Sequence, residues 1–507
     1  MPTRARNWLT PAAWVAAVAA LLLLIFPLGF PNYDTIYALL WGRELGDGLD
    51  PDRGAALPPT PHPLAELFGL LASPLNGGAI DLTMVVAYIS LGLVGYLVYR
   101  LGSLWFDRPI GAVAALIVLT RAPFLSNGLR AYVDLPYIVL VLGALVIETK
   151  RPRAGWPVLA LLAAAGLLRP EAWLFSFAYL AYLLLWPGES RTHLEGEGGV
   201  PLEPADTQNG GLIRPPFAGA RGTLPSHTAM LVVLALAGPV LWALYDWITT
   251  GSPTYSFTGT RETVEALGRH TGPVDLILYG PRALGEVLQW PGIVAALGGV
   301  MLGFAFLRRR STLGIAAAVL SLGAFAVLAT AGLAIIARYT MLAAAILTIF
   351  VALALLGWRL LEQGHPWRRA WQAFSAVVVL MFVVWAPNQW DLLSRVDTDL
   401  TNQGEIESDL SDLASSSAFE PPCLPISVPN HRAVPRLAFD LDVRPSRIVS
   451  SSEQRQPRRG YFLDPASPFV IHNFILDPND PARLETSVPP NFHRVARNES
   501  WVLYRRC

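Results

Sequence analysis

Long apolar runs are the feature of this sequence that most limits how the chain can fold. The stretches at 11–30, 82–99 and 339–358 consist almost entirely of apolar residues. Each is close to the roughly 20 residues that a helix needs to cross a ~30 Å hydrocarbon core. Lipid offers no partners for backbone N–H and C=O groups, so runs of this kind cross the membrane as helices. The sequence therefore predicts a helical membrane protein.

Hydropathy predicts about eleven transmembrane spans. Their expected positions are 12–30, 81–99, 109–125, 133–148, 156–168, 173–186, 228–249, 291–307, 312–334, 339–358 and 371–387. The composition agrees, since 53% of the residues are hydrophobic and only 15% are charged. The net charge of +0 gives no excess of positive charge for nucleic acid, which we exclude as a partner.

The arginines predict the orientation of the chain in the cell membrane. If the N-terminus with Arg4 and Arg6 is cytoplasmic, alternating spans place the basic clusters at 150–153, 308–310 and 365–370 on the same side. This distribution follows the positive-inside rule. The first apolar run is too long for a signal-peptide core and has no small-residue cleavage pattern, so we expect an uncleaved anchor. The same alternation exports the loops at 31–80 and 251–290.

Residues 388–507 differ in composition from the predicted membrane domain at 1–387. They contain an amphipathic stretch at 404–418, which predicts a helix. Short apolar runs predict strands. These runs lie at 424–430, 436–443, 467–476 and 500–507. We expect a small extracytoplasmic α/β domain. By contrast, the Gly- and Pro-rich stretch at 187–227 predicts a flexible cytoplasmic loop.

The two cysteines of the chain, Cys423 and Cys507, both fall in this exported segment. An oxidising compartment favours a disulfide between them, and two free thiols are the alternative.

Polar residues gather where the predicted spans meet the exported face. Asp34 follows the first span, and Arg169, Arg338 and several further acids and bases lie at the ends of others. Charge beside apolar spans is costly, so a group of charged residues on one side predicts a functional site.

The chain resembles the GT-C membrane glycosyltransferases. The resemblance is carried by Asp34 just after the first span, by the Pro-rich stretch PPTPHPLAELFG at 58–69, and by Ala-Arg-Tyr at 337–339, which opens a late span. It is also carried by the exported domain after the last helix. The resemblance implies a GT-C-like fold and a polyprenyl-phosphate-linked sugar donor. It further implies inverting transfer of a hexosyl or pentosyl group to an envelope glycan, lipid or protein acceptor on the exported face.

The resemblance also implies roles for individual residues. Asp34 matches the family's general base, which takes the proton of the attacking hydroxyl. Arg169, Arg261 and Arg338 are the candidates for binding the donor phosphate, because arginine offers a charged fork of donors. The remaining candidate substrate-binding residues are Tyr33, Trp41, Glu44, His62, Arg130, Asp134, Glu171 and Tyr339.

We expect no obligatory metal and no cofactor. Many family members have two adjacent acids in the first loop, whereas here Tyr33 precedes Asp34 and the other acids come later. Hard cations need several converging oxygen ligands.

Each assignment has a structural alternative. Asp34 is also suited to capping the helix that follows it. Arg169 and Arg338 are also suited to ion pairs between helices, or to reaching the interface with their charged ends. The aromatic residues fit an interfacial belt, and Arg261 fits a solvated helix face.

Two other classes of function stay open: a secondary transporter or translocase of a lipid-linked intermediate, and a non-catalytic scaffold. Within the exported domain, the segment at 428–442 is our hypothesis for acceptor binding.

Overall fold

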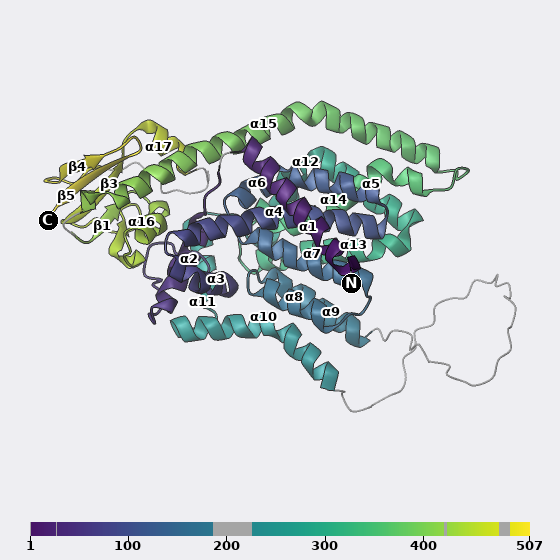
Figure 1. The fold of residues 1–507 in the computed structure, drawn as a ribbon, viewed down its shortest axis with the longest axis horizontal. Helices are drawn as coiled ribbons and strands as arrows, with labels where there is room; N and C mark the ends of the chain where they lie inside the picture. The colour runs from purple at the N-terminus through teal and green to yellow at the C-terminus, as the bar shows by residue number, and fades with distance from the viewer. Residues whose placement is uncertain (1, 27, 186–225, 420–422, 476–486) are drawn as a thin grey trace.

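A bundle of helices with a small sheet domain at one end makes up the fold (Figure 1). The structure, a computed structural model, describes residues 2–26, 28–185, 226–419, 423–475 and 487–507. The predicted loop at 187–227 lies outside the described residues, apart from its last two positions, which begin α10.

Six helices in the described part of the chain are long and apolar enough to cross a membrane. They are α4 (Gly78–Trp105), α10 (Ser226–Thr250), α12 (Gly272–Phe306), α13 (Arg308–Thr330), α14 (Met341–Leu356) with its flanking 3-10 turns, and α15 (Arg368–Ser415). The pair α5 (Arg108–Leu119) and α6 (Ala122–Leu129), which bends by 62° at its break, is a seventh if the two helices form one broken span.

The remaining predicted spans also fall on helices, but these are shorter. They are the apolar part, Pro11–Ile25, of α1 (Pro2–Ile25), together with α7 (Asp134–Lys150), α8 (Trp156–Gly166) and α9 (Glu171–Leu185). The chain is a multi-pass membrane protein, and the count of about eleven spans stays a prediction.

The centre of the bundle is α14. It is apolar on every side, and 83% of its apolar window is buried inside the protein. The backbone of α12 comes very close to it, because a Cβ atom added at Gly299 would lie 1.9 Å from the carbonyl oxygen of Phe350. Small residues allow such approach between helices in lipid, where packing rather than the hydrophobic effect drives association.

The C-terminal domain contains a five-stranded sheet in the order β2-β1-β3-β5-β4. Its strands are β1 (Ile426–Val428), β2 (Ile448–Ser450), β3 (Gly460–Pro465), β4 (His493–Arg497) and β5 (Trp501–Arg506). β1 pairs in parallel with β2 and β3, while β5 pairs antiparallel with β3 and β4. The predicted mixture of helix and strand is confirmed at this level.

Two of the predicted strands are wrong. The run at 436–443 lies mainly in helix α16 (Val434–Asp440), and the run at 467–476 contains helix α17 (Pro468–Asn473). Both helices begin with a proline in their first turn, a position where its missing N–H costs nothing. A short apolar run fits the two-residue repeat of a strand and the 3.6-residue repeat of a helix alike. The prolines were therefore the better indication of a helix start.

The C-terminal domain is joined to the first loop by a shared hydrophobic core. Tyr37 and Trp41 of α2 (Tyr33–Gly46) belong to the same buried cluster as Val434 and Leu437 of α16. α15 also connects the two parts, because it runs unbroken through the predicted boundary at 387/388 (Figure 1). The first loop and the C-terminal domain therefore form one unit at the end of the bundle.

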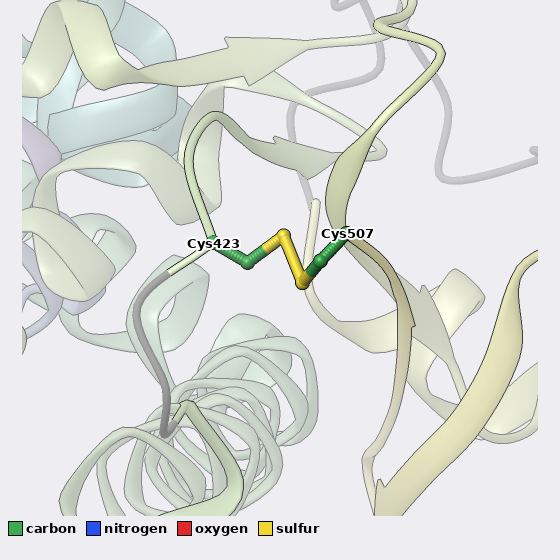
Figure 2. Close-up of a disulfide and its surroundings, with 2 residues drawn as sticks. All are labelled: Cys423 and Cys507. Carbon is green, nitrogen blue, oxygen red and sulfur yellow. A yellow bond between two sulfur atoms is a disulfide. The ribbon is translucent and has the colours of Figure 1, made fainter.

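Cys423 and Cys507 form a disulfide (Figure 2). It links the segment before β1 to the end of β5, across 84 residues of sequence.

The loop predicted at 251–290 is largely helical. It contains α11 (Tyr255–Ala266) and the first half of α12. α12 is broken at Gln289, whose φ of 61° and ψ of 163° are not helical. The apolar span predicted at 291–307 corresponds to the second half only.

Candidate active site

A cavity of about 910 Å³ lies where the first loop, the bundle and the C-terminal domain meet. Its walls come from α2, from the segments before α7 and α9, from α10 and α11, from the turn before α14, and from α15. His431 and Arg432 complete it from the C-terminal domain. Segments that are distant in sequence and predicted to share the exported face therefore surround one space.

Asp34 lies on the cavity wall in the first turn of α2. The helix is capped by Asn32, whose Oδ1 accepts hydrogen bonds from the backbone N–H groups of Asp34 and Thr35 at 2.8 and 3.3 Å. The capping role that we considered for Asp34 thus belongs to Asn32. The Asp34 carboxylate is left to face the cavity, with its side chain 21% exposed.

Arg338 is the ion-pair partner of Asp34. Its Nη1 lies 3.2 Å from Asp34 Oδ2, although the two residues are 304 positions apart. Burial by itself raises the pKa of Asp34, but the Arg338 charge and hydrogen bond, together with the nearby His62 and Arg432, outweigh burial and hold this pKa below its ordinary value of 3.8. Asp34 is therefore an ionised carboxylate at neutral pH.

Arg169 differs from Arg338 in that it pairs with two buried acids. Its Nη2 lies 2.6 Å from Glu171 Oε1, and its Nη1 donates to Asp134 Oδ1. All three side chains are at least nine-tenths buried, and the Arg169 guanidinium stacks 4.3 Å from the ring centre of Tyr339. The cluster carries a net negative charge, so Arg169 has less positive charge to offer an anion than Arg338 has.

His62 is the N-cap residue of α3 (Pro63–Ala72) and lines the cavity. Burial, and then the positive charge of Arg169, lower its pKa to about 4. Its Nδ1 atom is buried without a hydrogen-bond partner among the described residues. At neutral pH, His62 is therefore an uncharged imidazole that can exchange hydrogen bonds with a substrate but cannot neutralise a phosphate.

This lowered pKa predicts a stability effect that depends on pH. Between pH 6.5 and about 4 the unfolded chain binds a proton at His62 that the folded chain does not, so stability falls as pH falls. We expect His62→Gln to reduce the acid-induced loss across this window by about 1–2 kcal/mol, since the ring is only partly buried. Unfolding curves in detergent at pH 7 and pH 4.5 measure the difference. The exposed His493→Gln is the control, and equal acid sensitivity of wild type and His62→Gln would contradict the prediction.

Four further predicted residues line the cavity: Tyr33, Arg130, Glu171 and Tyr339. The Tyr33 hydroxyl donates to the carbonyl of Leu57 at 2.9 Å, and Arg130 donates to Gln403 Oε1 at 2.8 Å. These hydrogen bonds fix the cavity wall.

Trp41, Glu44, Asp134 and Arg261 do not belong to the lining of this cavity. Trp41 is buried and donates from Nε1 to the carbonyl of Asp52, and Glu44 accepts from the Asp52 N–H at 2.6 Å. Arg261 is exposed on α11, with its guanidinium 5.8 Å from the ring centre of Phe257.

Several lining residues were not predicted individually: Asp246, Glu407, His431 and Arg432. Glu407 Oε2 is buried without a hydrogen-bond partner in the described part of the chain. His431 and Arg432 fall within the segment at 428–442 that we proposed for acceptor binding. Nδ1 of His431 lies 2.9 Å from Glu453 Oε1, and its ring packs edge-on against Tyr33 at 5.5 Å.

No group of three or more His, Cys, Asp or Glu side chains is arranged to hold a metal ion within the described ranges.

Comparison with known proteins identifies the fold. No protein-family model matches the sequence, and no curated protein matches it significantly. Among solved structures, ArnT from Cupriavidus metallidurans bound to undecaprenyl phosphate aligns over 98% of both chains, with 14% identity and a TM-score of 0.53. The apo oligosaccharyltransferase of Archaeoglobus fulgidus aligns with 87% of this chain and 64% of its own, with 11% identity and a TM-score of 0.46. The ArnT match confirms the GT-C-like fold predicted from the sequence.

Proposed function

We propose that this protein is a membrane glycosyltransferase that moves a sugar from a polyprenyl-phosphate-linked donor to a hydroxyl of an envelope glycan, lipid or protein. The observation that carries the proposal is the Asp34–Arg338 ion pair, which joins an ionised carboxylate and a guanidinium on the wall of one large cavity. The ArnT structure that shares this fold contains undecaprenyl phosphate. Both groups suit a reaction whose leaving group is a lipid phosphate.

In the proposed reaction, an acceptor hydroxyl attacks the anomeric carbon from the face opposite the phosphate. The bond between the anomeric carbon and the phosphate oxygen breaks, and its electron pair leaves with the lipid phosphate. Asp34 takes the hydroxyl proton as the new glycosidic bond forms, with inversion at the anomeric carbon. General-base help of this kind is worth about 10²–10⁴-fold in rate.

Arg338 is the best placed of the three predicted arginines to bind the donor phosphate. Arg169 is offset by two acids, and Arg261 lies outside the cavity lining. A donor phosphate that attracts Arg338 also draws its charge away from Asp34. The pKa of Asp34 then rises, because the Arg338 charge that lowers it is shared with the phosphate, and the carboxylate becomes a better base when the donor is bound.

The function is tested by transfer from labelled polyprenyl-phosphate sugars to envelope acceptors with the purified chain, comparing wild type with Arg338→Gln. We expect the donor KM to rise about tenfold or more, because a charge-assisted hydrogen bond is lost. The acid limb of kcat/KM should also move to higher pH, since burial alone raises the pKa of Asp34. Arg338→Lys should restore part of the donor affinity. Absence of transfer by wild type across a broad donor panel would favour the translocase or scaffold alternatives.

We place the acceptor beside the C-terminal domain, where His431 and Arg432 line the cavity. Their domain shares a core with α2, so these side chains are held in a fixed position relative to Asp34. Arg432→Gln is expected to raise the acceptor KM about tenfold and to leave the donor KM unchanged. Arg458→Gln, at an exposed position of the same domain, is the matched control. A change in donor KM alone would move the acceptor elsewhere.

A further inference from the structure

A second, smaller cavity of about 200 Å³ lies apart from the candidate active site and shares none of its lining residues. It lies where three irregular points meet: the break between α5 and α6, the non-helical position in α12, and α15 beside Pro387. Its polar lining residues are Arg121, Gln289, Trp385 and Gln389.

Arg121 is the charged residue of this small cavity. It occupies the break between the two helices and is only 6% exposed. Its Nε donates to the carbonyl of Ile117 at 3.3 Å. Across the described ranges of the chain, no acid forms an ion pair with Arg121, although buried charges in proteins are normally paired because an isolated one is costly. The guanidinium therefore lacks the anion that such a position requires.

The neighbouring polar groups also have unused hydrogen-bonding capacity. Trp385 Nε1, Gln289 Oε1 and Gln389 Oε1 are buried without partners among the described residues. Gln389 is held in place by a hydrogen bond from its Nε2 to the carbonyl of Thr120 at 2.8 Å. Buried polar atoms are rarely left unpaired in folded proteins, so several around one small cavity indicate a missing ligand. The indole N–H of Trp385 is a donor, and the amide of Gln289 presents its NH₂ group to the cavity when it turns over, whereas Gln389 is fixed by its bond to Thr120.

The surroundings of the cavity fit the boundary between lipid tails and headgroups. The predicted spans at 109–125, 291–307 and 371–387 all have their exported ends at this level. Trp390 lines the cavity and is 72% exposed, and Trp290, which follows the lining residue Gln289 in sequence, is 60% exposed. Tryptophan is enriched at this interface. Val383 and Val384 present an exposed apolar surface next to the cavity, as expected for residues that face lipid tails.

We propose that this small cavity binds the phosphate group of a membrane lipid in the exported leaflet, with Arg121 as its charged ligand and Trp385 Nε1 as a second donor. A guanidinium binds phosphate through paired N–H donors. The site takes a phosphate anion without contributing to sugar transfer, so it is independent of the function proposed above.

The test is a titration of the purified full-length protein with dioleoylphosphatidylglycerol, followed by native mass spectrometry. Uncharged dioleoylglycerol is the lipid control. Arg121→Gln is expected to weaken the tightest phosphatidylglycerol binding about tenfold or more, because a charged contact is lost. Arg309→Gln, at an exposed position at the other end of the bundle, should leave binding unchanged. Trp385→Phe removes one neutral donor and should weaken binding about threefold.

Addition of millimolar inorganic phosphate separates the two sources of the anion. Binding that depends on Arg121 and resists inorganic phosphate supports a lipid-borne phosphate. Displacement by inorganic phosphate supports the phosphate site but assigns it to a soluble anion. Should Arg121→Gln fail to fold, Arg121→Lys and Trp385→Phe still decide the question. Equal phosphatidylglycerol affinity in wild type and in the folded variants would overturn the proposal.

Discussion

Asp34→Asn is expected to lower the rate of sugar transfer by about 10²–10⁴-fold, the usual contribution of a general base. An amide has nearly the same shape as the carboxylate but cannot take a proton from the acceptor hydroxyl. Asp34 also lies in the first turn of α2, where Asn32 and not Asp34 caps the helix, so the substitution should leave the helix intact. Transfer from a labelled polyprenyl-phosphate sugar to a membrane acceptor measures the effect.

The matched control for this prediction is Asp47→Asn. Asp47 is an exposed acid at the other end of the same helix, so it tests whether any loss of charge on α2 impairs transfer. Unfolding curves for both variants establish that the fold is preserved. If Asp34→Asn transfers at the wild-type rate, the base is another group. Glu407 is then the next candidate, because it lines the same cavity and its Oε2 lacks a partner within the described residues.

The meeting of Asp34 and Arg338 was predictable in outline from the sequence. The positive-inside rule places both at the exported ends of apolar spans, and charged residues beside lipid gather where they can pair. The rule gives the face of the membrane but not the distance between two side chains. The pairing across 304 residues depends on how α2 and the turn before α14 pack, which apolar patterning does not specify.

The limits of sequence reasoning are clearest for Trp41, Glu44 and Arg261. All three were chosen because they are polar or aromatic residues in a predicted exported loop. Trp41 and Glu44 instead contact Asp52 within the core that the first loop shares with the C-terminal domain. Arg261 is exposed on its helix, in agreement with the solvated face that was its alternative. A loop sequence does not reveal which of its residues a distant domain will cover.

Glu66 shows the same limit, because its sequence context resembles that of an exposed residue. It lies in the Pro-rich stretch at 58–69, where an acid between apolar residues resembles a solvent-facing position. The structure buries it completely, with its Oε2 3.4 Å from Arg53 Nη2 and accepting from the Tyr245 hydroxyl. Arg53 in turn lies 4.5 Å over the Trp41 ring. The packing of α2, α10 and the segment around Arg53 about α3, which no local pattern encodes, accounts for this burial.

Arg169→Met is expected to lower the free energy of unfolding by about 3–5 kcal/mol, or to prevent folding. The substitution leaves the carboxylates of Asp134 and Glu171 buried without their shared positive partner. Their second oxygens, Oδ2 and Oε2, already lack hydrogen-bond partners in the described part of the chain, so the substitution removes the hydrogen bonds that Arg169 gives to both carboxylates without a replacement. Thermal unfolding in detergent, followed by tryptophan fluorescence, measures the loss.

The decisive control is the triple variant Asp134→Asn, Glu171→Gln and Arg169→Met. Neutralising all three charges removes the uncompensated carboxylates, so most of the lost stability should return, as it does when a buried ion pair is replaced as a unit. This variant also separates two roles for Arg169. If Arg169 only compensates its two acids, the triple variant should keep the wild-type donor KM. A stable triple variant whose donor KM rises tenfold would instead assign Arg169 to the donor phosphate. A single Arg169→Met variant as stable as wild type would show that Arg169 does not compensate the two buried acids.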